Sequence, residues 1–391
     1  MMPPIIIIGA GLAGWTTARE LRKLDKTTPV LLITADSGDF YAKPSLSNAF
    51  TQKRAPAQLV TTPAASMAAS QNVTLQAHTR VSAIDTQRQI VSTSAGDFAY
   101  AKLVLATGAQ AIRIPLGGNA ASEVLSVNSL ADFTEFHVRL TQVNSAAPNH
   151  RTDIKKRIVI MGGGLIGCEF ANDLISSGID VTVVDPSASP IAALLPTGLS
   201  EELREALVNQ GVVWHFGTTV QRVDQHTGAD GTLRVQLANG EVLAADVVLS
   251  AIGLRADLSL AQAAGLASER GVLVDVRLQT SAANVYALGD GAQYANGRTL
   301  PYVMPIMHAG KALAATLAGQ PTPVQFPLMP VAIKTPALPL VVAPAAPGTV
   351  GQWAQSEPGV WLFTDPDQVV KGFALSGPQT SRRAELAKQV V

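Results

Sequence analysis

The sequence predicts an α/β protein with two similar parallel-sheet domains, followed by a small C-terminal α+β domain. Two stretches that start 153 residues apart repeat one pattern, IIIIGAGLAGWTTARELRK from Ile5 and IVIMGGGLIGCEFANDLIS from Ile158. After Gln320 the composition changes, because prolines become frequent and short strand patterns alternate with turns. A chain of 391 residues is too long for one hydrophobic core, which favours two or three domains.

Each repeat has a β-branched run, then G-x-G-x-x-G, then a helical pattern. The glycines are Gly9, Gly11 and Gly14 in the first repeat, and Gly162, Gly164 and Gly167 in the second. In a Rossmann unit the first glycine permits a tight turn, the second lets a pyrophosphate approach the backbone, and the third lets the helix pack on the strand. A strand before and a helix after complete the pattern. Each repeat therefore predicts a dinucleotide site.

Both repeats continue in the same order. The strand pattern PVLLIT leads to Asp36, 27 residues after Gly9, and the strand pattern VTVV leads to Asp185, 23 residues after Gly162. A later strand ends at Gly108 in one repeat and at Gly253 in the other. An acid at this place bonds ribose hydroxyls and repels a 2′-phosphate, so Asp185 favours NAD over NADP. The recurring order indicates a structural repeat.

Composition excludes several functions. The 29 basic and 29 acidic residues balance, which argues against a nucleic-acid or anionic-membrane surface. The chain has no basic leader and no apolar run of about 20 residues, so we expect a cytoplasmic protein. Cys168 is the only cysteine, which excludes an internal thiol relay and indicates a small buried thiol. The six histidines lack metal-ligand spacing, so no metal is expected.

Local patterns divide the rest of the chain. Residues 144–156 read as a loop, and 235–243 read as a hairpin turning at Asn239-Gly240. A helix is expected from Met307 to Ala318, and another from about Ser381. The predicted segments are 1–112 (first dinucleotide-binding domain, first part), 113–245 (second dinucleotide-binding domain), 246–319 (first dinucleotide-binding domain, second part) and 320–391 (C-terminal α+β domain).

The assignment of FAD and NAD to those segments comes from TSAANVYALGD, which ends at Asp290. With this segment the chain resembles the two-dinucleotide-binding flavoprotein reductases. The resemblance implies that the first fingerprint binds FAD, that the second binds NADH, and that Asp290 bonds the ribityl chain of FAD. Gly291 departs from the relatives, which often carry cysteine there; the mechanism requires no thiol at that position.

A narrower resemblance covers essentially the whole chain. The segments FYAKPSLSNAF, GGGLIGCEFANDL, LPYVMPIM and VAIKTPALPLVV are similar to the rubredoxin reductases. These enzymes serve bacterial alkane hydroxylation by passing electrons from NADH to rubredoxin, a small iron protein. The resemblance implies hydride transfer from NADH to flavin N5, then release of single electrons to the carrier.

The resemblance also implies a set of site residues. Lys43 and Glu169 are expected to form a catalytic ion pair near the flavin, since a buried lysine needs a counter-ion. A helix starting around Pro305 is expected to point its N-terminus at the negative charge of the reduced flavin, with Lys334 adding positive charge. The further cofactor-binding positions are Asp36, Pro44, Val81, Thr107, Gly108, Arg113, Gly253, Gly289 and Val303. The expected cofactors are FAD and NAD, the expected partner is rubredoxin, and a monomer is favoured.

Several alternatives stay open at this point. The same fold serves ferredoxin and flavorubredoxin reductases. Peroxidase and oxidase relatives need a redox cysteine where this chain reads SLSNAF, and disulfide reductases need a cysteine pair. An alternative of another class is a flavin-binding interaction protein whose conformation NADH switches.

Overall fold

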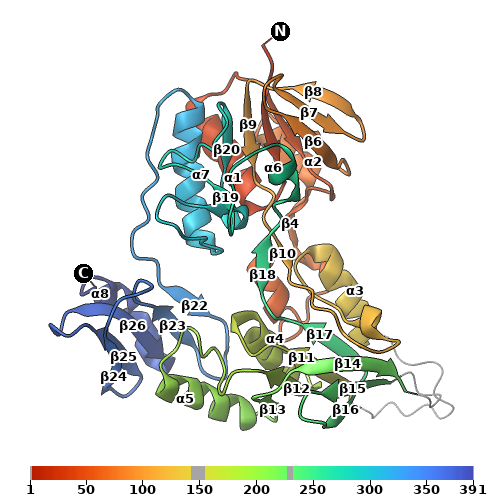
Figure 1. The fold of residues 1–391 in the computed structure, drawn as a ribbon, viewed down its shortest axis with the longest axis vertical. Coiled ribbons are helices and arrows are strands. Elements are labelled where there is room, and N and C mark those ends of the chain that lie inside the picture. The colour runs from red at the N-terminus through yellow and green to blue at the C-terminus, as the bar shows by residue number, and fades with distance from the viewer. Residues whose placement is uncertain (1, 142–154, 227–231, 391) are drawn as a thin grey trace. The chain divides into compact units, whose positions relative to one another are not determined.

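The computed structural model describes residues 2–141, 155–226 and 232–390 (Figure 1). The chain forms two compact units. Unit 1 comprises residues 1–42, 60–110 and 254–329, and unit 2 comprises 43–59, 111–253 and 330–391. Residues 43–59, which the sequence groups with the first FAD segment, belong to unit 2. The predicted loop 144–156 falls almost wholly outside the described residues.

A parallel sheet of five strands in the order β20-β9-β1-β2-β5 forms the core of unit 1. Its central strand is β1, a fully buried run of four isoleucines that pairs with β2 and β9. The strands are β1 (Ile5–Ile8), β2 (Val30–Ile33), β5 (Thr74–Gln76), β9 (Lys102–Leu105) and β20 (Val285–Ala287). Burial on both faces explains the continuous apolar runs in the sequence.

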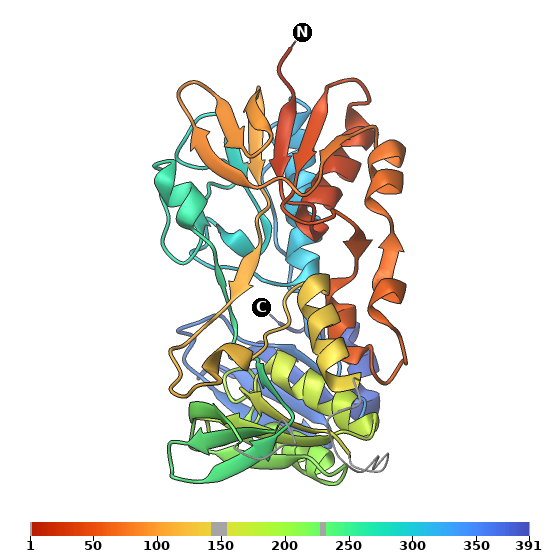
Figure 2. The same cartoon turned by 90° about the vertical axis from the view of Figure 1, so that its right-hand side faces the viewer.

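Two long helices of unit 1 run side by side, α1 (Leu12–Leu24) and α7 (Val303–Leu317) (Figures 1 and 2). Gly310 permits this approach, because a Cβ there would lie 2.8 Å from Thr16 Cγ2. The expected helix from Met307 starts four residues earlier, at Val303. The smaller elements are α2 (Ala64–Ser70), α6 (Ser259–Ala263), the pairs β3 (Phe40–Tyr41) with β4 (Val60–Thr62) and β19 (Val272–Leu273) with β21 (Ala292–Gln293), and the meander β6 (Val81–Asp85), β7 (Ile90–Thr93) and β8 (Gly96–Ala99).

Unit 2 contains a second parallel sheet, in the order β13-β12-β11-β17. The predicted hairpin is confirmed, because β15 and β16 pair antiparallel and Gly240 N donates to Leu237 O. The strands are β11 (Arg157–Met161), β12 (Asp180–Asp185), β13 (Val213–Phe216), β14 (Val220–Gln225), β15 (Leu233–Leu237), β16 (Val242–Ala245) and β17 (Val247–Ser250). The helices are α3 (Leu130–Thr141), α4 (Leu165–Ser176) and α5 (Thr197–Val208). The two-stranded pair of β10 (Ala109–Ala111) and β18 (Leu254–Ala256) belongs to unit 1, apart from Ala111.

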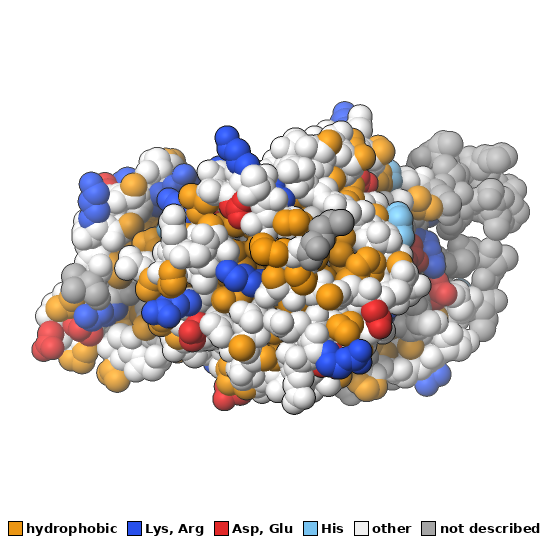
Figure 3. Space-filling model, turned by 90° about the horizontal axis from the view of Figure 1, so that it is seen from above, with side chains coloured by type: hydrophobic (Ala, Val, Ile, Leu, Met, Phe, Trp, Pro, Cys, Tyr) orange, Lys and Arg blue, Asp and Glu red, His pale blue; other side chains and the backbone are white. Residues whose placement is uncertain are grey.

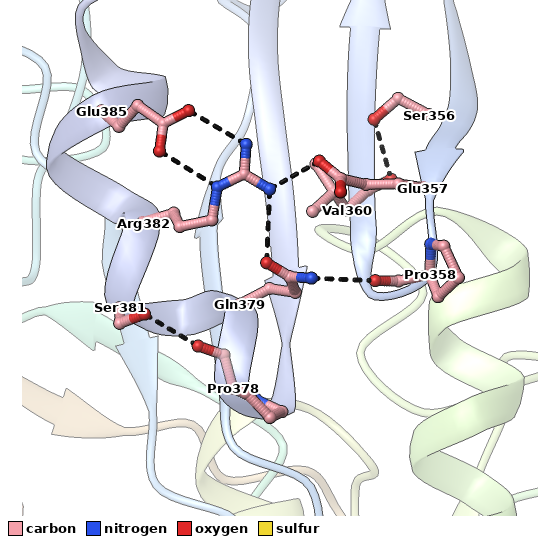
Figure 4. Close-up of polar contacts among 9 residues, drawn as sticks. All are labelled: Ser356, Glu357, Pro358, Val360, Pro378, Gln379, Ser381, Arg382 and Glu385. Carbon is pink, nitrogen blue, oxygen red and sulfur yellow. Dashed lines mark hydrogen bonds and ion pairs between the residues drawn. The ribbon is translucent and has the colours of Figure 1, made fainter.

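The C-terminal part of unit 2 is the expected α+β domain. Its antiparallel sheet has the order β22-β23-β26-β25-β24. The strands are β22 (Val331–Ile333), β23 (Leu340–Ala343), β24 (Gln352–Glu357), β25 (Val360–Thr364) and β26 (Val370–Ser376). The last helix, α8 (Arg383–Ala387), follows a 3₁₀ turn. Arg382 joins this helix to the β24–β25 hairpin by bonding Glu385 at 2.9 Å and Glu357 at 2.5 Å (Figure 4).

Surface charge follows the balanced composition. On the face drawn in Figure 3, lysine and arginine side chains are dispersed among apolar and acidic ones. Within the described part of the chain, no helix combines the length and apolarity needed to cross a membrane.

Candidate active site

The first fingerprint forms the turn between β1 and α1. A Cβ on Gly14 would lie 1.9 Å from Gly9 O, and one on Gly9 would lie 2.2 Å from Ala106 O, so both positions exclude side chains. Gly11 differs, because no described atom beyond its chain neighbours lies within 4 Å of its Cβ position. Its backbone angles (φ −75°, ψ −169°) suit any residue. Open space at the second glycine is what close approach of a pyrophosphate requires.

The second fingerprint repeats this geometry between β11 and α4. A Cβ on Gly167 would lie 1.9 Å from Gly162 O, whereas Gly164 again faces open space at φ −75° and ψ −170°. A glycine is the N-cap of both α1 and α4, so no N-cap side chain bonds the first N–H groups of either helix. These groups and the helix dipole suit a phosphate. Both turns therefore fit a dinucleotide.

The two predicted ribose acids do not occupy the same register position. Met161 pairs with Val184, which places Asp185 beside Gly162. In unit 1, Ile8 pairs with Ile33, so the residue beside Gly9 is Thr34. Asp36 lies two residues further on and accepts the Thr34 hydroxyl at 2.6 Å. The ribose contact of Asp36 stays a prediction.

Asp185 also supports the second fingerprint loop. It is 9% exposed; its Oδ2 accepts Gly163 N at 2.6 Å, and its Oδ1 accepts Ser187 N at 2.7 Å. The carboxylate thus lies against the residue between the first two glycines. This position suits the predicted contact with the NADH ribose, which remains a prediction.

Replacing Asp185 with serine is expected to weaken NADH use and relax the rejection of NADPH. The change removes a carboxylate acceptor and the charge that repels a 2′-phosphate, so we expect KM for NADH to rise about tenfold, equivalent to about 1.4 kcal/mol. Steady-state assays with both nucleotides measure this. An unchanged ratio of NADH to NADPH turnover would remove Asp185 from the site.

Unit 1 brings the late aspartate, which follows the edge strand β20, to the carboxyl end of the neighbouring strand β9. Leu288 N donates to Leu105 O at 3.1 Å, and a Cβ on Gly291 would lie 3.0 Å from Gly108 O. The segment that carries Gly289 and Asp290 therefore packs against Thr107 and Gly108, as a shared FAD site requires. Glycine at position 291 suits this close approach.

The segment that carries Gly289 and Asp290 also packs against α1 and a buried tyrosine. A Cβ on Gly289 would lie 3.1 Å from Ala13 Cβ, and Gly289 N donates to Tyr294 Oη at 3.1 Å. Burial raises the pKa of Tyr294 to about 12, so this phenol stays protonated. The α7 N-cap, Tyr302, makes no side-chain capping bond, and Val303 is 41% exposed. These features leave the α7 N-terminus suited to an anion.

Replacing Asp290 with alanine is expected to lower FAD retention. Asp290 lies in the short 3₁₀ helix Gly289–Gly291, where its predicted ribityl bond is worth about 1.5–3 kcal/mol for a charged acceptor. The flavin-to-protein absorbance ratio after purification measures the loss. Full occupancy with wild-type affinity would exclude the ribityl role.

A buried polar cluster surrounds Glu169 in unit 2. Glu169 is 8% exposed; its Oε2 accepts Ser47 Oγ at 2.6 Å and lies 2.8 Å from Lys334 Nζ. Its Oε1 accepts Lys334 N at 3.0 Å. Lys334 Nζ also donates to Ser47 Oγ at 2.8 Å and to Pro44 O. Lys334 is therefore an ion-pair partner of Glu169.

The other predicted site residues fall on both units. Lys43 and Pro44 begin the 3₁₀ helix Lys43–Asn48 of unit 2. Arg113, Gly253 and Lys334 also belong to unit 2, whereas Val81 begins β6 in unit 1. The Lys43–Glu169 pair and the flavin contacts of these residues stay predictions.

Sequence reasoning missed two neighbours of Glu169 on α4. Asp173 accepts Phe50 N at 3.0 Å and Thr51 N at 2.8 Å, and Asn172 Oδ1 accepts Ala337 N at 2.9 Å. Burial raises the pKa of Asp173. Three polar residues at helical spacing in the otherwise apolar LIGCEFANDLIS were the available signal.

The buried-thiol interpretation of Cys168 is confirmed. Its side chain is 0% exposed, its Sγ donates to Gly163 O at 3.3 Å, and burial raises its pKa. A thiol in this state is unreactive. Within residues 2–141, 155–226 and 232–390, no group of three or more His, Cys, Asp or Glu side chains is arranged to hold a metal ion.

Family comparison agrees with this geometry. Residues 3–315 match the family described as pyridine nucleotide-disulphide oxidoreductase, and the chain belongs to that family. Residues 323–390 match the rubredoxin binding C-terminal domain. The predicted α/β fold with its C-terminal α+β domain is confirmed, and family membership makes the protein an oxidoreductase that uses FAD and NAD(H).

Individual relatives within this oxidoreductase family are reductases of electron carriers. The chain is 43% identical to the rubredoxin-NAD(+) reductase of Alcanivorax borkumensis, over 100% of this chain and 99% of the relative. It is 42% identical to the nitric oxide reductase FlRd-NAD(+) reductase of Aeromonas salmonicida, over 99% and 96%. The reductase in a covalent putidaredoxin reductase–putidaredoxin complex matches with a TM-score of 0.85 at 25% identity, over 99% of this chain and 91% of that one.

Proposed function

We propose that this protein is an NADH-dependent flavoprotein reductase whose electron acceptor is rubredoxin. The observation that carries the proposal is the joining of two open dinucleotide turns, at Gly11 and Gly164, to a C-terminal domain of the rubredoxin-binding type. The full-length similarity to rubredoxin-NAD(+) reductases supports the same acceptor.

Each of the two glycine turns would bind one dinucleotide. Bound FAD would supply the conversion between the two-electron hydride of NADH and the single electrons that an iron carrier accepts. The N-terminus of α1 would hold the FAD pyrophosphate beside Gly11, and Asp290 would bond its ribityl chain. The N-terminus of α4 would hold the NADH pyrophosphate beside Gly164, and Asp185 would bond its ribose. The N-terminus of α7 would stabilise negative charge on the reduced flavin.

Unit 2 supplies the ionic groups on the NADH side. Glu169 lies just after the first turn of α4, close in sequence to the open position at Gly164. Its carboxylate is held by Ser47 and Lys334, and Lys43 begins the same 3₁₀ helix as Ser47. We assign this group to orienting the nicotinamide and excluding water during transfer.

Flavorubredoxin is the second candidate acceptor. The similarity to FlRd-NAD(+) reductases, at 42%, nearly equals that to the rubredoxin reductases. The proposal has four further parts. The enzyme serves alkane hydroxylation, and it is a monomer located in the cytoplasm. Its chain divides into four segments, with boundaries after residues 112, 245 and 319.

A panel of acceptors tests the function. The purified flavoprotein would be assayed anaerobically with NADH and with rubredoxin, ferredoxin or flavorubredoxin. The proposal expects rubredoxin to have the highest kcat/KM. Preference for flavorubredoxin would establish the second candidate. Flavin reduction without electron export to any acceptor would favour the NADH-switched interaction protein.

A further inference from the structure

The segment that carries Lys334 lies along helix α4. Lys334 N donates to Glu169 Oε1, and three residues later Ala337 N donates to Asn172 Oδ1. Positions 169 and 172 are also three residues apart, on one face of the helix. The segment is therefore pinned at two matched points.

The contacts of Lys334 are more specific than a simple ion pair requires. Its backbone N–H binds one oxygen of Glu169 and its ammonium binds the other, so one residue orients the whole carboxylate. Ser47, 6% exposed, donates to Glu169 and accepts from Lys334. A buried carboxylate needs such partners, because an unpaired charge is costly to desolvate.

We propose that Lys334 is a positioning residue for the NADH reaction, holding the Glu169 carboxylate in one orientation on α4. The inference rests on the proposed function, in which α4 begins at the NADH turn. Its consequence is that the C-terminal domain, matched as a rubredoxin-binding unit from residue 323, takes part in flavin reduction as well as in acceptor binding.

A double-mutant cycle tests this role without any acceptor. The proteins are wild type, Glu169→Gln, Lys334→Met and the double variant, with Lys334→Arg as the rescue. Lys155→Met is the matched control, because the Lys155 side chain is 65% exposed and its ion pair with Asp180 is long, at 3.8 Å. Anaerobic stopped-flow gives the limiting rate of flavin reduction per bound flavin.

We expect Lys334→Met to lower that rate about tenfold and the double variant to lose no more than Glu169→Gln alone, as coupled residues do. Lys334→Arg should recover most of the rate, and Lys155→Met should match wild type. Additive losses, or a wild-type limiting rate per bound flavin in Lys334→Met, would overturn the proposal.

Hydrogen exchange on the flavin-free proteins provides a readout independent of turnover. Protection of the Lys334 amide should fall in Glu169→Ala, which removes the acceptor oxygen that Glu169→Gln keeps, and should be unchanged in Lys155→Met. Equal protection in all variants would contradict the contact itself. If Lys334→Met does not fold, Ser47→Ala enters the cycle in its place, because it removes the shared hydroxyl without leaving a charge unpaired. These measurements contain no rubredoxin. They would therefore remain valid even if the acceptor panel showed that rubredoxin is not the acceptor.

Discussion

Gly11→Val protein is expected to fold and to purify without flavin. The Cβ position of Gly11 faces open space and its backbone angles suit valine, so the apoprotein should tolerate the change. The same space is where the FAD pyrophosphate must approach. Overpacking of about 1–3 kcal/mol there corresponds to a loss of about 10–100-fold in FAD affinity. Flavin absorbance and titration with FAD measure it.

The matched comparison is wild-type protein stripped of its flavin. A bound ligand stabilises the folded state, so loss of FAD alone lowers the melting temperature. Gly11→Val and stripped wild type should therefore melt together. A variant that retains flavin at wild-type affinity would show that the first turn is not the FAD site. A variant that melts well below the stripped wild type would show that the change disturbs the fold instead.

Gly164→Val protein is expected to be yellow and unreactive toward NADH. Gly164 has the same angles and the same open space as Gly11, but it opens α4 in unit 2. The flavin should stay bound and should still be reduced by dithionite. Reduction by NADH should slow about 10–100-fold at a fixed, subsaturating concentration, because the pyrophosphate is crowded. Anaerobic stopped-flow with both reductants measures the contrast.

The two valine variants form a crossed test. Each leaves the other turn intact, so flavin loss should follow Gly11 and NADH insensitivity should follow Gly164. Flavin loss from Gly164→Val, together with full occupancy in Gly11→Val, would reverse the assignment of the two sites.

Local sequence patterns predicted the elements whose causes are themselves local. The isoleucine run of β1, the glycine fingerprints and the Asn239-Gly240 hairpin each depend on neighbours within a few residues. The apparent equivalence of Asp36 and Asp185 failed because spacing along a chain does not give strand register. Pairing places Thr34 beside Gly9, so the first loop carries its acid two residues later.

Long-range pairing was beyond the sequence patterns. Lys334 and Glu169 are 165 residues apart, and they meet because the segment after β22 lies along α4. The family resemblance proposed Lys43 for that carboxylate, a pairing that stays a prediction, and it proposed Lys334 for the reduced flavin. The linear chain does not show that Lys334 also reaches Glu169. Residues 43–59 likewise join unit 2 through contacts such as the Phe50 N–H bond to Asp173.

An anaerobic double-mixing experiment tests electron export from the flavin to rubredoxin most directly. The flavoprotein is first reduced with one equivalent of NADH and then mixed with excess oxidised rubredoxin. The proposed function predicts rapid return of oxidised flavin absorbance with two rubredoxins reduced per NADH, since the nucleotide supplies two electrons and the iron accepts one. A flavin that NADH reduces rapidly but that stays reduced in the presence of rubredoxin would contradict it.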